Sequence, residues 1–193
     1  LMDAVLNGLS LRICLAYLDD VVVFSSSIEE HLTRLKKVFE RLQVAGLKLK
    51  PSKCNILQRR VTFLGHVMSA EGIETDPQKI EAVEQWPRPT SVREVRAFIG
   101  LASYYRRFVR NFAEIASPLH GLTKKNARFT WSEDHEVAFQ KLKQALIEAP
   151  ILITPDDDHE FILDTDASDV SMGAVLSQVI DGQERVVAYS SKV

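Results

Sequence analysis

The chain has 193 residues, of which 46% are hydrophobic and 26% charged, and its formal net charge at pH 7 is −2. This composition is ordinary for a globular protein of one large or two small domains, and the longest apolar runs are far too short to span a bilayer. Two isolated cysteines, Cys14 and Cys54, are too few for a disulfide framework and predict reduced thiols inside the cell.

A hairpin with acidic residues at its tip is predicted near the start of the chain. Residues 11–17 are a strand candidate, and residues 21–24 are a second one that is rich in β-branched side chains. Leu18, Asp19 and Asp20 lie between them, so the two carboxylates fall at the turn.

A helix is predicted directly after this hairpin. Ser27 can cap it, and Glu30, three residues later, completes a capping box. Gly46 stands where helices commonly end in a left-handed residue. One apolar face is predicted from the helical spacing of Ile28, Leu32, Leu35, Phe39 and Leu42.

The next segment is predicted to be extended. Residues 48–53 form a basic loop or short edge strand. Residues 61–68 are predicted as one strand that contains Gly65. A turn signal at 70–73 then predicts a second hairpin.

Residues 76–125 are predicted to be helical and to pack as a small bundle. The first helix has Pro77 at its first position, where the missing N–H costs nothing. The second opens with a capping box at Ser91, and we expect Gly100 to break it. A third is predicted over 113–122.

The last part returns to strands. Ser132 starts a long helix that Pro150 ends. An Asp-Gly pair at 181–182 predicts a tight hairpin turn. The strands are expected at 161–167, 173–179 and 186–190. The expected fold class is therefore α+β.

The small net charge conceals an uneven distribution. From Arg88 to Arg110 there are six arginines and one acid, whereas no Lys or Arg occurs from Gln144 to Glu184. A basic middle and an acidic end suggest separate roles. The alternative is that both segments are simply solvated faces.

The sharpest chemical signal is the sequence Tyr17-Leu-Asp19-Asp20. Two adjacent carboxylates at a turn between apolar strands concentrate negative charge on a rigid tip, and Mg²⁺ takes one or two carboxylates together with substrate phosphates. Two such ions can activate a hydroxyl and stabilise a leaving pyrophosphate. The alternative is that Asp is simply a good turn residue.

Longer motifs decide between these alternatives. In chain order they are Tyr17-Leu-Asp-Asp-Val-Val-Val-Phe-Ser25, Gly46-Leu-Lys-Leu-Lys-Pro-Ser-Lys-Cys54, Phe63-Leu-Gly-His66, Phe98-Ile-Gly-Leu-Ala-Ser-Tyr-Tyr-Arg-Arg-Phe108 and Asp164-Thr-Asp166-Ala-Ser168. With these motifs, essentially the whole chain resembles the gypsy-type reverse transcriptases of long-terminal-repeat retrotransposons. Its last part resembles the opening of their ribonuclease H domain.

The resemblance implies three parts. Residues 1–75 would be the C-terminal part of a reverse transcriptase palm, with a primer-grip hairpin. Residues 76–125 would be a helical thumb. Residues 126–193 would be a linking helix and the first strands of a ribonuclease H-like domain. We expect both ends to be cut, with a third polymerase aspartate before the first residue and further ribonuclease H carboxylates after the last.

The resemblance also implies catalytic roles. Asp19 and Asp20 match the second catalytic motif as metal ligands, Asp19 the more direct one, and Tyr17 would pack near the primer terminus. Lys53 matches a lysine near the triphosphate that protonates the leaving group; the alternative is an ordinary exposed lysine. Asp166 matches the first carboxylate of the ribonuclease H metal site.

Asp164 is the rival of Asp166, because residues two apart on a strand share a face. Nucleic-acid binding is implied for the primer-grip residues Phe63, Leu64, Gly65 and His66. The basic thumb would follow phosphates without reading sequence through Arg93, Arg96, Tyr104, Arg106, Arg107 and Arg110, although not all of these can face one duplex.

The parent enzyme is therefore expected to be an RNA-directed DNA polymerase with ribonuclease H endonuclease activity. It would use two Mg²⁺ ions, an RNA/DNA template-primer and deoxynucleoside triphosphates, in a cytoplasmic particle or the nucleus and with no membrane partner. The sequence indicates no oligomeric state. Because ligands of both metal sites lie outside this piece, we expect it alone to perform neither reaction. The alternative is a catalytically inactive nucleic-acid-binding remnant.

Overall fold

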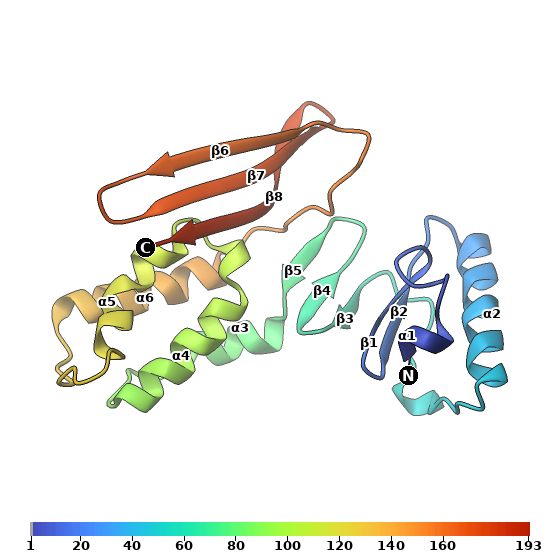
Figure 1. The fold of residues 1–193 in the computed structure, drawn as a ribbon, viewed down its shortest axis with the longest axis horizontal. Coiled ribbons are helices and arrows are strands. Elements are labelled where there is room, and N and C mark those ends of the chain that lie inside the picture. The colour runs from blue at the N-terminus through green and yellow to red at the C-terminus, as the bar shows by residue number, and fades with distance from the viewer. Residues whose placement is uncertain (1) are drawn as a thin grey trace. The chain divides into compact units, whose positions relative to one another are not determined.

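The structure is a computed structural model that describes residues 2–193. It contains two compact units, Leu1–Phe63 and Leu64–Val193 (Figure 1). Helices and strands are mixed in both units, which confirms the predicted α+β class. The three-part division at residues 75 and 125 stays a prediction. Among the described residues, no helix is both long and apolar enough to cross a membrane.

The first unit consists of an antiparallel hairpin and one long helix. The hairpin strands pair with Cys14 opposite Val23 and Tyr17 opposite Asp20. Its core is formed by Leu6, Cys14, Val38 and Leu42. The elements are α1 (Met2–Val5), β1 (Cys14–Tyr17), β2 (Asp20–Val23), α2 (Ile28–Val44), the 3₁₀ helix η1 (Pro51–Lys53) and β3 (Val61–Phe63).

Two predictions for this unit need correction. The first strand begins at Cys14 and not at residue 11, because Leu11 has a left-handed φ of 66° that interrupts extended backbone. The apolar face of α2 is also shifted: Leu35, Val38 and Leu42 are buried, whereas Ile28, Leu32 and Phe39 are exposed. The face of the helix that carries Leu35, Val38 and Leu42 is turned toward the core. The predicted face shares only Leu35 and Leu42 with it.

The ends of α2 agree with the sequence, except that the Glu30 carboxylate accepts from the N–H of Ser26 and not from that of Ser27, so the predicted capping box is only half formed. Ser27 caps the helix by accepting a hydrogen bond from the Glu30 N–H at 3.2 Å. Gly46 has a φ of 69°, and the N–H of Leu47 donates to the carbonyl of Leu42 at 2.9 Å. This closes the last turn with the left-handed glycine that such an ending requires.

The second unit is a helical layer with a three-stranded sheet packed on it. Figure 1 shows β8 beside α5, and β8 is in contact with α5 and with the 3₁₀ helix η2. The elements are β4 (His66–Met68), β5 (Ile73–Thr75), α3 (Pro77–Glu84), α4 (Val92–Tyr104), η2 (Arg106–Phe108), α5 (Phe112–Leu122), α6 (Glu133–Ile147), β6 (Phe161–Ala167), β7 (Met172–Ile180) and β8 (Gln183–Lys192).

One apolar core holds this unit together. Phe98, Phe139 and Leu142 lie at its centre with essentially no exposed surface. Leu152 joins the core from the segment after α6, and it exchanges backbone hydrogen bonds of 2.7 and 2.9 Å with Ile73 of β5. Val186 and Tyr189 of β8 also pack against it, so the helices and the sheet β6-β7-β8 share a single core.

The sheet β6-β7-β8 is an antiparallel meander. Strand β6 has the predicted bounds, and the Asp181-Gly182 turn has positive φ at both residues (52° and 75°), as the Asp-Gly pair predicted. A register shift between Leu176 and Ser177 marks a bulge in the pairing with β8.

Two further predictions were wrong. The single strand over 61–68 is divided, because Leu64 and Gly65 have φ values of 50° and 67° and turn the chain. The predicted break at Gly100 does not occur. Helix α4 continues to Tyr104 because Phe98, Ile99 and Ala102 are buried on one face, and this packing exceeds the small helix preference lost at one glycine.

Candidate active site and nucleic-acid interface

The acidic turn is the exposed tip of the β1–β2 hairpin. Asp19 lies in the turn, and Asp20 is the first residue of β2, directly opposite Tyr17. Leu18 has a φ of 55°, which closes the turn tightly. The Asp19 and Asp20 residues are exposed, and Tyr17 is 56% exposed beside them. Two carboxylates and an aromatic ring are therefore available to an outside ligand.

The base of this hairpin is fixed by burial. Cys14, at the start of β1, has no exposed surface, and burial raises the pKa of its thiol. Both cysteines are free thiols, as predicted. A buried strand start and an exposed turn give the carboxylates a rigid support.

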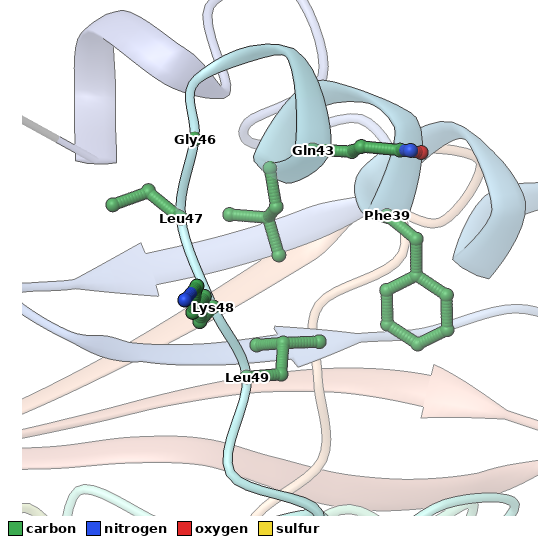
Figure 2. Close-up of a pocket in the computed structure, with 7 residues that line it drawn as sticks. Phe39, Gln43, Gly46, Leu47, Lys48 and Leu49 are labelled. Atoms are coloured by element: carbon green, nitrogen blue, oxygen red, sulfur yellow. The ribbon is translucent and has the colours of Figure 1, made fainter.

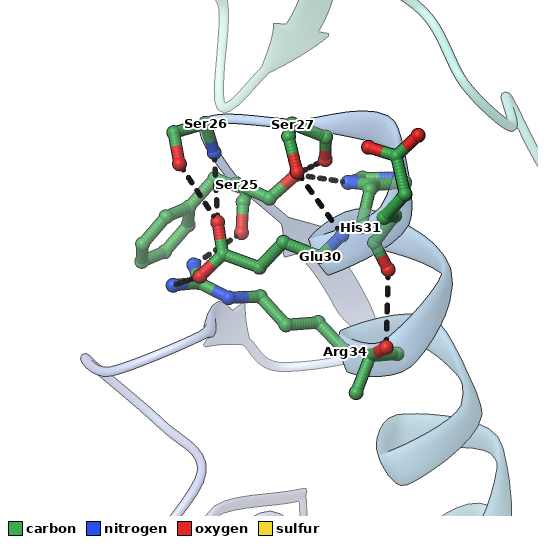
Figure 3. A network of polar contacts seen from close by, with 9 residues as sticks. Ser25, Ser26, Ser27, Glu30, His31 and Arg34 are labelled. Carbon is green, nitrogen blue, oxygen red and sulfur yellow. Dashed lines mark hydrogen bonds and ion pairs between the residues drawn. The ribbon is translucent and has the colours of Figure 1, made fainter.

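The end of β2 is tied to α2 by a polar network (Figure 3). Arg34 donates to the carbonyl of Phe24 at 2.5 Å and to Glu30 at 2.6 Å. Glu30 also accepts hydrogen bonds from the N–H and hydroxyl of Ser26. These hydrogen bonds lower the pKa of the Glu30 carboxyl, and the one from the Ser26 backbone N–H has the largest effect. The network fixes where the chain leaves the acidic hairpin.

Lys53 ends the short helix η1 and is exposed. Its backbone N–H donates to the carbonyl of Lys50 at 2.9 Å, which holds the turn. The side chain has no hydrogen bond or ion pair with the residues that the structure describes. Its predicted role at a triphosphate stays a prediction.

A hollow of about 440 Å³ lies at the C-terminal end of α2 (Figure 2). It is lined mainly by apolar side chains, with one charged residue, Lys48: Phe39, Leu42, Gln43, Gly46, Leu47, Lys48 and Leu49. Its lining contains no Asp, Glu, His or Cys side chain.

The predicted primer-grip residues form a turn supported by aromatic rings. The hydroxyl of Tyr104 donates to the carbonyl of Leu64, and that of Tyr105 donates to the carbonyl of Gly65 at 2.6 Å. The His66 ring lies against both tyrosine rings. Phe63 ends β3 and is half-buried.

Burial also changes two ionisable groups behind this turn. Burial is the main cause that lowers the pKa of His66, and a hydrogen bond with the carbonyl of Leu64 opposes it. Burial raises the pKa of Tyr105 to about 12. Both side chains are therefore neutral near pH 7. The hydrogen bond from Tyr105 to this turn was not predicted from the sequence.

The thumb arginines have different roles. Arg106 donates to the carbonyl of Ser191 at 2.5 Å, and Arg107 donates more weakly to that of Val187 at 3.4 Å. Arg96 donates to the carbonyl of Thr123 at 3.0 Å. These three guanidinium groups thus hold the fold together.

Arg93 and Arg110 are exposed, as are the other three, but they differ from them in their contacts. Neither has a hydrogen bond or ion pair within residues 2–193. Among the predicted thumb contacts, these two arginines and the half-exposed Tyr104 are the most available to a nucleic acid.

The acidic residues of the sheet lie on β6. Asp164 is opposite Val175, and Asp166 is opposite Gly173. Both aspartates are exposed, and alternation along a strand puts them on one face. Asp166 lines a hollow of about 470 Å³ with Lys192 of β8. Asp166 therefore borders a concave surface.

Asn111 was not singled out from sequence. A Cβ on Gly173 would lie 2.8 Å from its Oδ1 atom, so this glycine makes room for Asn111 opposite Asp166. Asn111 has a left-handed φ of 55° directly before α5.

The described residues contain no group of three or more His, Cys, Asp or Glu side chains that could hold a metal ion. Asp19 with Asp20 and Asp164 with Asp166 are two separate carboxylate pairs. Each pair could contribute to a metal site and would need ligands from a substrate or from further protein.

Two family models match parts of this chain. Residues 1–68 match the model described as reverse transcriptase (RNA-dependent DNA polymerase). Residues 131–193 match the model described as RNase H-like domain found in reverse transcriptase. Asp19 and Asp20 fall within the first match, and Asp166 falls within the second.

Similar curated proteins are transposon polyproteins. The Retrovirus-related Pol polyprotein from transposon 297 of Drosophila melanogaster is 44% identical over 92% of this chain and 17% of its own length. The Transposon Tf2-3 polyprotein of Schizosaccharomyces pombe is 36% identical over 92% of this chain and 13% of its own length. The chain thus spans a small part of these relatives.

A similar solved structure is that of the foamy viral protease-reverse transcriptase in complex with RNA/DNA hybrid. It matches with a TM-score of 0.84 and 26% sequence identity, covering 100% of this chain and 26% of the other.

Proposed function

Because this chain belongs to the reverse transcriptase and ribonuclease H family of retrotransposon Pol polyproteins, we propose that it is part of an RNA-directed DNA polymerase. In this proposal it supplies two catalytic carboxylates and a surface for the template-primer. The observation that carries the proposal is the exposed Asp19-Asp20 turn on a buried hairpin base. Nucleotidyl transfer needs acidic groups at a fixed position that remain open to a triphosphate.

The donor set at this turn fits Mg²⁺. Carboxylate oxygens are its preferred protein ligands, and one or two carboxylates leave coordination positions for phosphate oxygens. When bound, Mg²⁺ would stabilise charge on the attacking and leaving oxygens. The residues of this chain hold the ligands: β1 and β2 set the turn, and the Ser26–Glu30–Arg34 network fixes the start of α2.

The template-primer is proposed to contact the second unit through backbone phosphates. Arg93 and Arg110 are free to neutralise phosphates without reading sequence. The Leu64–Gly65 turn offers a backbone that can approach a strand closely, because Gly65 has no Cβ. A polymerase that copies any sequence needs contacts of this kind.

The sheet is proposed to begin a ribonuclease H domain. Asp166 would be the first carboxylate of its metal site, and Asp164 is the alternative on the same face. The RNase H-like match over residues 131–193 supports this assignment. As with the polymerase site, the pair would need further ligands to cleave RNA.

A test of the polymerase proposal is to replace the matching segment of the transposon 297 polyprotein with this chain and to measure templated primer extension in Mg²⁺. Asp19→Asn and Asp20→Asn should each lower the extension rate by more than about 100-fold, since a metal ligand is lost. Asp157→Asn, at an exposed loop aspartate, is the matched control and should leave the rate unchanged. Full extension by both site variants would refute the proposal.

The isolated chain has a second candidate function, that of a nucleic-acid-binding module without catalysis. The separation of its carboxylates into two pairs favours this reading. Purified chain should then show no primer extension, and it should bind a template-primer equally with Mg²⁺ or with EDTA, more weakly as salt rises. Extension by the isolated chain would exclude this candidate.

A further inference from the structure

Two consecutive tyrosines at the end of α4 hold the Leu64–Gly65 turn through hydrogen bonds. Tyr104 donates its hydroxyl proton to the carbonyl of Leu64, and Tyr105 donates to the next carbonyl, that of Gly65, at 2.6 Å. The donors and the acceptors are separated by 40 residues in sequence. Two adjacent hydroxyls thus hold two adjacent carbonyls of one turn.

His66 provides a third contact. Its Nδ1 lies 2.9 Å from the carbonyl oxygen of Leu64. A carbonyl can only accept, so Nδ1 carries the proton and donates it. The ring is packed among Tyr104, Tyr105 and Phe108, with centroid distances of 5.2, 5.5 and 5.7 Å.

Core packing alone does not explain why both tyrosine hydroxyls donate hydrogen bonds to the turn. Tyr105 has no exposed surface, and a buried ring is expected to bring its hydroxyl to a partner. Tyr104, however, is 51% exposed, so burial does not require its hydroxyl to bond to the protein. Its hydroxyl nevertheless donates to the turn.

The hydroxyls of Tyr104 and Tyr105, here called the clamp, fix the direction of one peptide group in the turn. In a trans peptide the C=O and the N–H point in opposite directions, and the structure has no cis peptide bond among its described residues. Since the Leu64 carbonyl points at Tyr104, the Gly65 N–H of the same peptide group points away from it. Gly65 has a φ of 67°, a backbone conformation that favours glycine, and a Cβ there would lie 3.4 Å from the Tyr104 ring.

We propose that Tyr104 and Tyr105 are positioning residues that orient the Leu64–Gly65 turn so that the Gly65 N–H donates to a backbone phosphate of the primer strand. This rests on the function proposed above. The tyrosines do not contact the reacting atoms; they act through the turn. Their hydroxyls, more than their rings, are the groups required.

The test uses the full chain and a duplex with a recessed 3′ end, prepared as an RNA/DNA hybrid. Tyr104→Phe and Tyr105→Phe each remove one hydroxyl and keep the ring. Each should weaken binding about fivefold, the usual effect of one hydrogen bond, and the double variant more. The salt dependence should stay unchanged, because no phosphate-neutralising charge is lost. Tyr189→Phe is the matched control, since Tyr189 lacks a hydrogen bond within residues 2–193.

An NMR readout separates positioning from simple stability. In the wild-type chain the Gly65 amide resonance should shift when the hybrid is added, and in the double variant it should not. Thermal unfolding of Tyr104→Phe, at a half-exposed site, should be unchanged. Double-variant affinity within twofold of wild type, or an equal loss in Tyr189→Phe, would overturn the proposal.

The free chain gives an independent readout. Without nucleic acid, the backbone NMR order parameter at Gly65 should be lower in the double variant than in the wild type, because the turn is less rigid. If the wild-type chain fails to bind the hybrid, the proposed function fails. If the Gly65 order parameter is identical in both chains, the clamp itself is refuted.

Discussion

Replacing Gly72 by alanine should destabilise the second unit strongly. Gly72 lies in the turn between β4 and β5. Its φ of 136° is a backbone conformation that residues other than glycine rarely adopt. An alanine Cβ would lie 2.2 Å from the carbonyl oxygen of Leu152. That oxygen accepts the Ile73 N–H at 2.7 Å, and Leu152 N–H donates back at 2.9 Å.

The expected cost follows from these contacts. Backbone strain of this kind costs about 1–3 kcal/mol. Moving Leu152 away from the Cβ would weaken two hydrogen bonds, each of which contributes about 1 kcal/mol. The free energy of unfolding should therefore fall by about 3–5 kcal/mol, a large share of the roughly 5–15 kcal/mol available to a domain.

Gly100→Ala is the matched control, because the substitution is the same and the expected sign is opposite. Gly100 lies inside α4 with ordinary φ and nothing within 4 Å of a Cβ. Alanine should stabilise the helix there by about 0.5–1 kcal/mol.

Urea unfolding followed by tryptophan fluorescence measures both changes. The two tryptophans, Trp86 and Trp131, both lie in the second unit, so the signal reports on that unit alone. A Gly72→Ala midpoint equal to wild type, within error, would show that the Leu152 carbonyl moves freely and that the strain argument is wrong.

Further substitutions test the core, the arginines and the buried histidine. Leu142→Ala should cost about 2–5 kcal/mol in urea unfolding, whereas Val137→Ala, on the exposed side of the same helix, should cost far less. Arg106→Ala should destabilise the second unit by about 1–3 kcal/mol and leave the salt slope of hybrid binding unchanged. Arg93→Ala should lower that slope by about 1 and leave stability unchanged; the reverse pattern would contradict our assignment of both arginines. Because burial lowers the pKa of His66 in the folded chain, the unfolded chain takes up a proton first below about pH 6.5, so stability falls with decreasing pH there. His66→Phe should reduce this loss when urea midpoints at about pH 7.5 and about pH 5.5 are compared, and an unchanged loss would exclude His66 as its source.

Features built from near neighbours were predicted correctly. Ser27 caps α2, Gly46 closes it, and the Asp181-Gly182 turn joins β7 and β8. The Asp19-Asp20 pair falls at the β-turn because flanking strands of four residues pair directly across it. Each feature depends on hydrogen bonds between residues a few positions apart, and the chain itself brings those residues together.

Some local signals were overruled by packing. The helix preference lost at Gly100 is small beside the burial of Phe98 and Ala102, so α4 continues. Gly65 was expected inside a strand, but the hydroxyls of Tyr104 and Tyr105 hold it in a turn. A propensity read from a few residues omits such distant partners.

The sequence alone determined the family, the fold class and the two carboxylate pairs, because these depend on motifs and on residues adjacent in the chain. Only the tertiary structure decided which basic and aromatic side chains are available for binding. Arg106 and Arg107 donate to carbonyls 85 and 80 residues away, whereas Arg93 has no such partner among the described residues. Tyr104 meets its turn across 40 residues. Such contacts depend on the path of the whole chain, and no spacing between neighbouring residues encodes them.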